Sequence, residues 1–158
     1  MKDLILYFSA SHNTEKFAKI IQEKTNGDLV QIEPENPYSK WFIFRTIRAK
    51  KEADKKIMPE FKKVNINLDE YDRVFIGYPI WWYTLPMIIY NFLEKYDLSG
   101  KTIVPFNTHE GSGSGGTYKT IQELVPNAKV LEGLPIQGAT MKLNQSKKIN
   151  EWIDGLNE

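Results

Sequence analysis

The chain has 158 residues, of which 41% are hydrophobic and 13% aromatic, and this is enough apolar material for one domain spanning residues 1–158. Lysine and arginine total 21 against 20 aspartate and glutamate residues, so the net charge of +1 provides no overall field for attracting nucleic acid. Cysteine is absent, which excludes disulfides, thiolate catalysis and cysteine-bound metals. Redox chemistry would therefore need a bound cofactor.

Hydrophobic runs and helix-type patterns alternate along the chain. A continuous apolar run such as 4–8 is typical of a strand buried on both faces, whereas the apolar–polar alternation over 28–33 is typical of an edge strand. Proline, glycine and asparagine mark the ends of most segments. In chain order we expect a strand over 4–8, a helix capped by Asn13 or Thr14 and ending at 26–27, a strand over 28–33, a helix over 38–56, a strand over 72–78, a helix over 86–93, a strand over 101–107, a helix over 118–125, a strand over 129–136 and a helix over 145–156.

Five strands that alternate with helices predict an α/β fold, a doubly wound parallel sheet with helices on both faces. The fifth strand should lie at an edge, because Gly133 and Pro135 interrupt it. In such sheets, ligands bind outside the carboxyl ends of the strands, where the strand order reverses. The segments that follow the first, third and fourth strands are therefore the candidate site.

All of the hydrophobic segments are short. The apolar run near the start is too short for the core of a signal peptide, and polar residues follow it directly. No stretch approaches the ~20 apolar residues of a membrane span. We therefore expect a cytoplasmic protein without a membrane partner.

The first candidate loop, residues 9–14, has the sequence Ser-Ala-Ser-His-Asn-Thr and leads into a predicted helix. Helix N-termini carry unpaired N–H groups and the positive end of the helix dipole, so they attract anions. The loop contains no lysine or arginine, which suits a phosphate that is held permanently better than one that is transferred. The alternative is that these residues only cap the helix.

The second candidate loop places three large aromatic residues, Trp81, Trp82 and Tyr83, just after a buried strand. Exposed aromatic side chains in a row need a surface to pack on, and a flat aromatic ligand is one such surface. The alternative is that a tryptophan folds back onto the protein, which we expect of at least one of the two.

The third candidate loop, residues 108–117, is rich in glycine and allows a ligand to approach the backbone closely. Gly111, Gly113 and Gly116 formally match a G-x-G-x-x-G dinucleotide motif, with Glu132 placed for a ribose contact. Gly/Ser repeats produce such matches by chance, and the motif normally follows the first strand. The alternative is a flexible loop without a ligand.

An anion loop, an aromatic surface and a glycine-rich loop on one edge predict a ligand with a phosphate at one end and a flat ring at the other, and FMN fits this description. The segment 9–14 resembles the T/S-x-T/S-G-N-T phosphate loop of the flavodoxin-like family. Residues 78–82, Tyr-Pro-Ile-Trp-Trp, resemble the second-loop signature of a bacterial subgroup of that family. The resemblance extends over essentially the whole chain and implies the flavodoxin-like strand order 2-1-3-4-5.

The resemblance also implies a role for each loop. The first would hold the FMN phosphate through hydroxyl, amide and backbone N–H groups, with His12 standing where many members have glycine. The second would line the isoalloxazine ring, and the third would close over its other side. The implied FMN-binding residues are Ser9, Ser11, His12, Asn13, Thr14, Pro79, Ile80, Trp81, Trp82, Thr108, His109, Glu110, Gly111, Ser112 and Gly113.

His109 is the candidate for a catalytic role, as a proton donor beside the flavin ring. The alternative is a loop residue that faces solvent. His109 and Glu110 do not form a metal motif, because Gly113 occupies the position where a zincin helix would need its second histidine. We expect no metal site.

Charge is distributed unevenly along the chain. Residues 40–63 contain nine positive and three negative residues, a net charge of +6, whereas the rest of the chain has 12 positive and 17 negative residues, a net charge of −5. Such a basic segment could attract an acidic redox partner or the phosphates of NAD(P)H. The alternative is an ordinary solvated helix face. We expect its aromatic residues, Tyr38, Trp41, Phe42 and Phe44, to pack on the body near the flavin.

These features favour an FMN-binding electron-transfer protein whose partner is a redox protein or a small-molecule electron acceptor. One alternative is an FMN-dependent NAD(P)H:quinone-type reductase on the same scaffold. A second is a non-catalytic binding or regulatory module that uses the basic segment 40–63 to contact a partner.

Overall fold

The continuous apolar runs form the central strands of a parallel sheet. β1 (Asp3–Tyr7), β3 (Arg73–Pro79) and β4 (Thr102–His109) are almost entirely buried, and β2 (Asp28–Gln31) is more exposed. The computed structural model describes residues 2–158. The helices are α1 (Asn13–Thr25), α2 (Phe42–Lys55), α3 (Met87–Lys95), α4 (Thr117–Leu124) and α5 (Ser146–Leu156), with 3₁₀ turns at Leu68–Glu70 and Gly138–Lys142.

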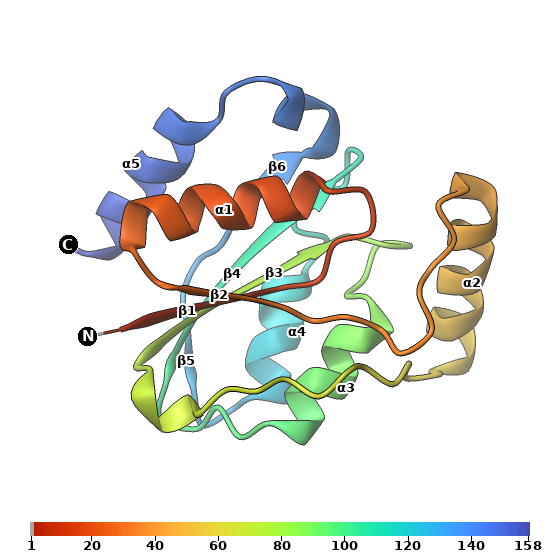
Figure 1. Ribbon diagram of the computed structural model, residues 1–158, viewed down its shortest axis with the longest axis horizontal. Coiled ribbons are helices and arrows are strands. Elements are labelled where there is room, and N and C mark those ends of the chain that lie inside the picture. The colour runs from red at the N-terminus through yellow and green to blue at the C-terminus, as the bar shows by residue number, and fades with distance from the viewer. Residues whose placement is uncertain (1) are drawn as a thin grey trace.

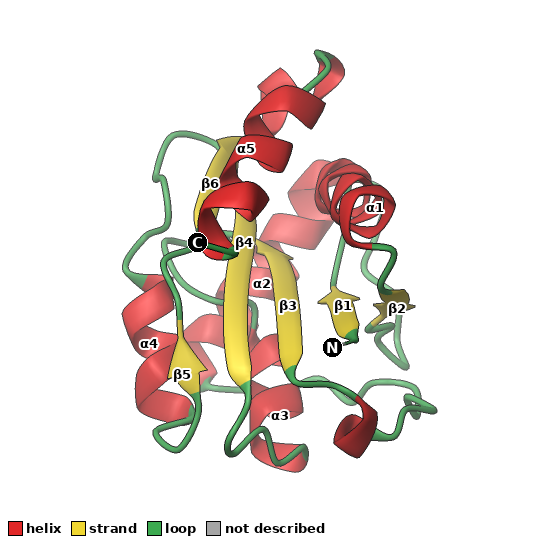
Figure 2. Cartoon of the chain, turned by 90° about the vertical axis from the view of Figure 1, so that its left-hand side faces the viewer, coloured by secondary structure: helices red, strands yellow, loops and turns green. Residues whose placement is uncertain are grey.

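The strand order is β2-β1-β3-β4-β5, and every pairing is parallel (Figure 2). This confirms the predicted fold class and strand order. The order reverses between β1 and β3, because the chain first adds β2 on one side of β1 and then β3 on the other. That reversal is where a doubly wound sheet binds its ligand.

The predicted fifth strand is divided into β5 (Lys129–Val130) and β6 (Leu134–Gln137), which both pair with β4. The register moves by one residue between them, since Val130 pairs with Ile103 but Leu134 pairs with Phe106. Gly133 explains the break, because a Cβ there would lie 2.3 Å from the Pro105 carbonyl oxygen and 2.6 Å from the Tyr118 ring. The predicted interruption at Gly133 is confirmed, and it divides the strand predicted over 129–136 into two short strands at the edge of the sheet.

Helices cover both faces of the sheet (Figure 1). Because strand residues alternate between the faces, Leu4 and Leu6 pack toward α3 and α4, whereas Ile5 packs toward α1 and α5. Each face thus has its own hydrophobic core. Within residues 2–158, no helix has both the length and the apolar character needed to cross a membrane.

The helix α2 stands at one end of the molecule (Figure 1). It buries few of its side chains. Only Ala49 and Glu52 are buried in it. It begins at Phe42, so the predicted start at Tyr38 was wrong. Tyr38 instead lies in the preceding segment, where its ring contacts Phe8 and its hydroxyl donates a hydrogen bond to Glu52.

We predict that Gly77→Ala destabilises the fold by about 2 kcal/mol. A Cβ at Gly77 would lie 2.1–2.8 Å from three ring carbons of Phe106, which itself packs on Phe17 at a centroid distance of 4.7 Å. Because Phe106 is completely buried, its ring can make room only by displacing its neighbours in the core. Urea unfolding measures the change.

The matched control is Gly155→Ala in α5, where a Cβ would meet nothing within 4 Å. There, alanine should stabilise the helix by about 0.5 kcal/mol because it loses less conformational freedom on folding. Equal unfolding midpoints for the two variants would contradict the assigned packing of Gly77.

Candidate functional site

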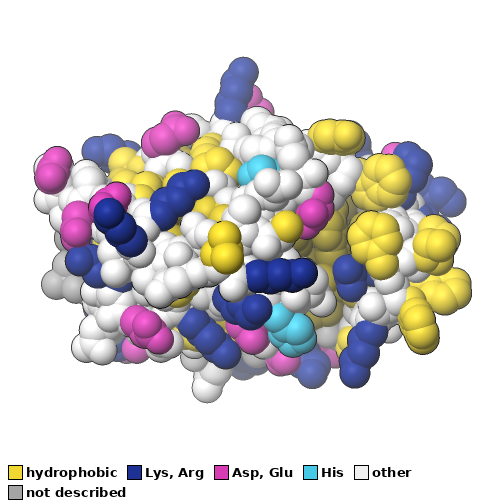
Figure 3. All heavy atoms as spheres, turned by 90° about the horizontal axis from the view of Figure 1, so that it is seen from above, with side chains coloured by type: hydrophobic (Ala, Val, Ile, Leu, Met, Phe, Trp, Pro, Cys, Tyr) yellow, Lys and Arg dark blue, Asp and Glu magenta, His cyan; other side chains and the backbone are white. Residues whose placement is uncertain are grey.

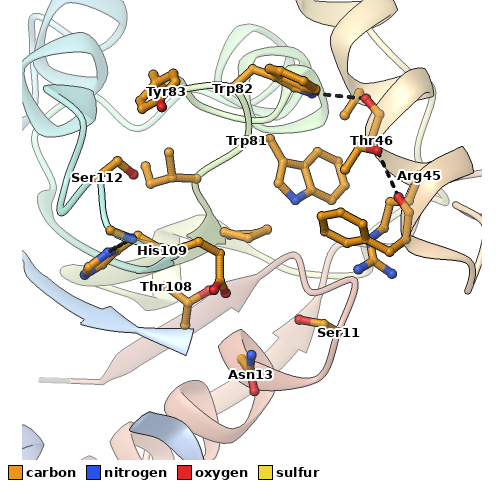
Figure 4. A pocket seen from close by; sticks show the side chains of 16 residues that line it. Ser11, Asn13, Arg45, Thr46, Trp81, Trp82, Tyr83, Thr108, His109 and Ser112 are labelled. Atoms are coloured by element: carbon orange, nitrogen blue, oxygen red, sulfur yellow. Dashed lines mark hydrogen bonds between the residues drawn. The ribbon is translucent and has the colours of Figure 1, made fainter. Parts of the chain in front are cut away.

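Three loops meet at the carboxyl edge of the sheet and enclose a cavity of about 590 Å³ (Figure 4). They follow β1, β3 and β4, as predicted. The pairing of β3 with β4 continues to Pro79 opposite Thr108, which keeps the second and third loops side by side. Eleven of the fifteen predicted residues line the cavity, namely Ser11, Asn13, Pro79, Ile80, Trp81, Trp82, Thr108, His109, Glu110, Gly111 and Ser112.

The first loop enters α1 through a left-handed residue. His12 occupies the N-cap position with φ 67° and ψ −6°, and its own side chain makes no capping hydrogen bond. The predicted cap by Asn13 or Thr14 was therefore wrong, since both lie inside the helix. A left-handed N-cap explains why glycine suits this position, and His12 adopts the same conformation with its side chain exposed.

Four of the predicted residues do not line the cavity: Ser9, His12, Thr14 and Gly113. The Ser9 hydroxyl accepts a hydrogen bond from the Glu15 N–H at 3.3 Å. The Thr14 side chain is buried, and its Oγ1 lies 2.9 Å from Oγ1 of Thr108. These two hydroxyls therefore support the loop from within, and residues 11 and 13 form its cavity-facing part.

The second loop makes a tight turn from Trp81 to Thr84. The N–H of each of these two residues donates to the carbonyl of the other, at 3.2 and 3.1 Å. Trp82 and Tyr83, between them, have φ of 51° and 61°. Left-handed conformations in non-glycine residues cost about 1–2 kcal/mol each, so the turn is strained and the surrounding contacts must hold it.

Contacts with α2 and the preceding segment hold that strained turn. The Trp82 indole N–H donates to the Thr46 carbonyl at 3.0 Å (Figure 4). Trp81 folds back onto the protein, as expected of at least one tryptophan. It makes edge-to-face contacts with Phe8 and Tyr38, at distances between ring centroids of 5.2 and 4.9 Å. The aromatic wall is thus fixed before any ligand arrives.

In the third loop, His109 accepts a hydrogen bond rather than facing open solvent. Its Nδ1 accepts from the Gly111 N–H at 2.9 Å. Partial burial, together with the positive charge of Lys148, lowers the pKa of His109, although Glu110 opposes the shift. His109 is therefore mainly neutral at pH 7, with its proton on Nε2.

The helix α2 adds four cavity residues that were not among the predicted FMN-binding residues: Phe42, Arg45, Thr46 and Ala49. Tyr83 is a fifth, from the second loop. Arg45 is the one lysine or arginine among the described residues that line the cavity, and it points inward on the side of Ser11 (Figure 4). The spacing of residues 45, 49 and 52 on one helix face was a signal, but only the fold shows that this face turns toward the loops.

The donors and walls of the cavity fit FMN. Ser11, Asn13 and the left-handed start of α1 provide neutral donors for a phosphate, and Arg45 adds a positive charge. Trp81 and Trp82 provide a flat wall for a ring system. The volume lies within the range of about 300–1,000 Å³ that is usual for cofactor sites.

Comparison with known proteins agrees with this geometry. A family model described as Flavodoxin matches residues 2–156. The chain belongs to the flavodoxin family. A search of curated proteins found no match.

Several solved structures resemble this flavodoxin-family chain. A putative flavoprotein from Bacteroides eggerthii is 34% identical with a TM-score of 0.86, over 99% of this chain and 98% of the other. One from Bacteroides uniformis is 30% identical with a TM-score of 0.82, over 97% of both chains. A flavoprotein from Lactobacillus acidophilus in complex with FMN is 24% identical with a TM-score of 0.73, over 89% of this chain and 96% of the other.

We predict that Arg45→Gln weakens FMN binding about tenfold, which corresponds to about 1.4 kcal/mol, and leaves riboflavin binding unchanged. The difference arises because only FMN carries the phosphate that the guanidinium would attract. Flavin fluorescence titration measures both affinities.

Lys51→Gln is the matched control, because Lys51 is an exposed cation on the same helix and does not line the cavity. An equal loss of FMN and riboflavin affinity in Arg45→Gln would place Arg45 near the ring or the ribityl chain instead of the phosphate.

Proposed function

We propose that the protein binds FMN in this cavity and acts as an electron-transfer protein. One observation carries the proposal. The N-terminus of α1, the side chain of Arg45 and the wall formed by Trp81 and Trp82 meet where the strand order reverses. Family membership and the FMN complex of the Lactobacillus acidophilus flavoprotein support the cofactor.

In this proposal, different residues of the cavity bind the phosphate end and the ring of the cofactor. Ser11, Asn13, Arg45 and the first backbone N–H groups of α1 would hold the phosphate end. The second and third loops would enclose the ring. FMN, when bound, supplies the electron chemistry, and the protein sets which redox states are favoured through the charges around the ring. In the third loop, these are the negative charge of Glu110 and the neutral imidazole of His109.

We expect the purified protein to take up one FMN per chain and to show a flavin absorption spectrum that survives dialysis. Asn13→Ala should lower FMN affinity about fivefold, because one amide hydrogen bond contributes about 1 kcal/mol. Visible absorption and fluorescence titration measure both quantities.

Asn127→Ala serves as the control, since Asn127 is exposed and lies outside the cavity. A protein that stays colourless and does not take up added FMN would refute the proposed function. Equal FMN affinities of Asn13→Ala and Asn127→Ala would refute the role of Asn13.

A second candidate function is an NAD(P)H:quinone-type reductase, and the position of His109 in the cavity favours it. Reduction of a quinone consumes two protons as well as two electrons, so a proton donor beside the ring would assist. The imidazole proton of His109 lies on Nε2, because Nδ1 accepts from Gly111. Steady oxidation of NADPH in the presence of a quinone would distinguish this enzyme from a carrier.

If the protein is such a reductase, its rate should increase as the pH falls through a value below 6.5. The reason is that burial lowers the pKa of His109, so the imidazolium, which is the acidic form, accumulates only below its ordinary range. His109→Gln should give a flat profile over pH 5–7. An unchanged profile in this variant would exclude His109 as the proton donor.

A further inference from the structure

The first two turns of α2 expose an unusual amount of hydrophobic surface. Five large side chains at this end of the helix are each more than 60% exposed, and we call them the α2 patch: Trp41, Phe42, Ile43, Phe44 and Ile47. They form one group of hydrophobic side chains with lysines and arginines beside it (Figure 3). Exposed apolar groups of this size mark interaction sites.

The α2 patch does not belong to a loosely attached helix. Arg48 donates to the carbonyls of Asn36 and Pro37 at 2.7 and 3.1 Å, and its Nε donates to Glu52 at 3.1 Å. Trp82 donates to the Thr46 carbonyl from the other side. These contacts hold the inner face of α2, so its outer face is presented in one fixed orientation.

Positive charge surrounds the α2 patch. Lys40 precedes it, and Lys50 and Lys51 follow it on the next turn of the helix. Glu52 is turned inward to Arg48, and Asp54 pairs with Lys50 at 3.1 Å, so the net positive charge beside the patch comes from Lys40 and Lys51. An apolar centre with a basic rim is complementary to an acidic protein surface with its own apolar centre.

The α2 patch also adjoins the cavity. Phe42 belongs to both, since it lines the cavity and is 67% exposed. The exposed side chains of Trp82 and Tyr83 continue the apolar surface across the cavity rim. A protein seated here would therefore cover the opening beside the proposed flavin site.

Two other occupants are less well matched. A two-fold interface with a second copy would set the same basic rim against itself, and like charges repel. A membrane surface favours a helix whose apolar face continues along its length. In α2 the outward residues change from apolar at 43 and 47 to charged at 50, 51 and 54.

We propose that the α2 patch is the docking surface for an acidic redox protein, which exchanges electrons with FMN through the adjoining cavity. This inference rests on the proposed function. The contact would be a transient one, burying less than about 1,200 Å², as is usual for redox encounters.

An acidic [2Fe–2S] ferredoxin is a suitable probe. In the test, the reduced ferredoxin gives one electron to the oxidised holo-protein, and stopped-flow absorption follows the second-order rate constant. We expect this rate to fall about tenfold between about 10 and 300 mM NaCl, because salt screens the attraction. Lys40→Glu/Lys51→Glu should lower the low-salt rate about tenfold.

A second variant separates the apolar contribution from the charge. Ile43→Ser/Phe44→Ser keeps every charge and should lower the rate about fivefold in high salt, where steering is screened. The matched control is Lys119→Glu/Lys129→Glu, which makes the same charge change on α4 and β5, away from α2 (Figure 1). This control should change the rate less than twofold.

FMN content and reduction by dithionite distinguish a failure of the proposed function from a failure of the docking proposal. Loss of both in the wild-type protein means that the proposed function has failed, and the docking proposal fails with it. The docking proposal alone would be overturned by another result. In that case FMN content and dithionite reduction are normal, but the rate constants with ferredoxin differ less than twofold between the wild type and both α2 variants.

Two further results would assign the α2 patch to another occupant and overturn the proposal. One is co-sedimentation with phosphatidylcholine vesicles containing about 30% phosphatidylglycerol that is lost in Ile43→Ser/Phe44→Ser. The other is a dimer in sedimentation velocity that the same variant converts to a monomer. We expect a monomer that stays in the supernatant.

Discussion

The candidate site depends on Thr108, which joins all three loops. Its backbone pairs with Pro79 across the β3–β4 register, and its carbonyl accepts the Ile80 N–H at 2.9 Å. Its hydroxyl lies 2.9 Å from the Thr14 hydroxyl at the start of α1. Both side chains are almost completely buried. Buried hydrogen bonds of this kind are expensive to leave unmade, so the three loops hold one arrangement without a ligand.

The second loop and α2 stabilise each other. The turn at Trp82 and Tyr83 is strained, and it gains the indole hydrogen bond to Thr46 and the Lys50 ammonium 5.0 Å from the Trp82 ring centroid. The helix buries few side chains of its own and gains an anchor from the same contacts. The helix that anchors Trp82 also carries Arg45. The contact that holds the strained turn therefore also holds a positive charge at the cavity.

Much of the fold and the three loops of the candidate site could be predicted from the sequence. Apolar runs located the central strands, and the polar, aromatic and glycine-rich loops after them did line one cavity. The interruption at Gly133 was predicted, but the one-residue shift in register between β5 and β6 depends on tertiary contacts and was not. For the same reason, Thr14 was expected to face a ligand, but its hydroxyl turns inward to a residue 94 positions away.

The basic segment was the least predictable part, since helical spacing shows which residues share a face but not where that face points. Tyr38 packs on Trp81, as expected of the aromatic residues, whereas Trp41 and Phe44 stay largely exposed. Arg48 and Glu52 neutralise each other on the inner face, and Arg45 reaches the cavity. Of the net charge of +6 over 40–63, the Arg48–Glu52 pair contributes nothing and Arg45 contributes one positive charge at the cavity. The rest lies outside the cavity, on the outer face of α2 and on the segments that precede and follow it.

Because of this charge distribution, residues 40–63 have a positive net charge and the rest of the chain has a negative one. The remaining residues carry a net charge of −5, so residues 40–63 attract an acidic partner, whereas the rest of the chain, taken together, repels it. Attraction at one end and repulsion elsewhere select a single orientation before contact, which steering by uniform charge cannot do. Because the attractive end is also the end where the cavity opens, the orientation that electrostatics favours is the one in which electrons have the shortest path to a flavin held by the three loops.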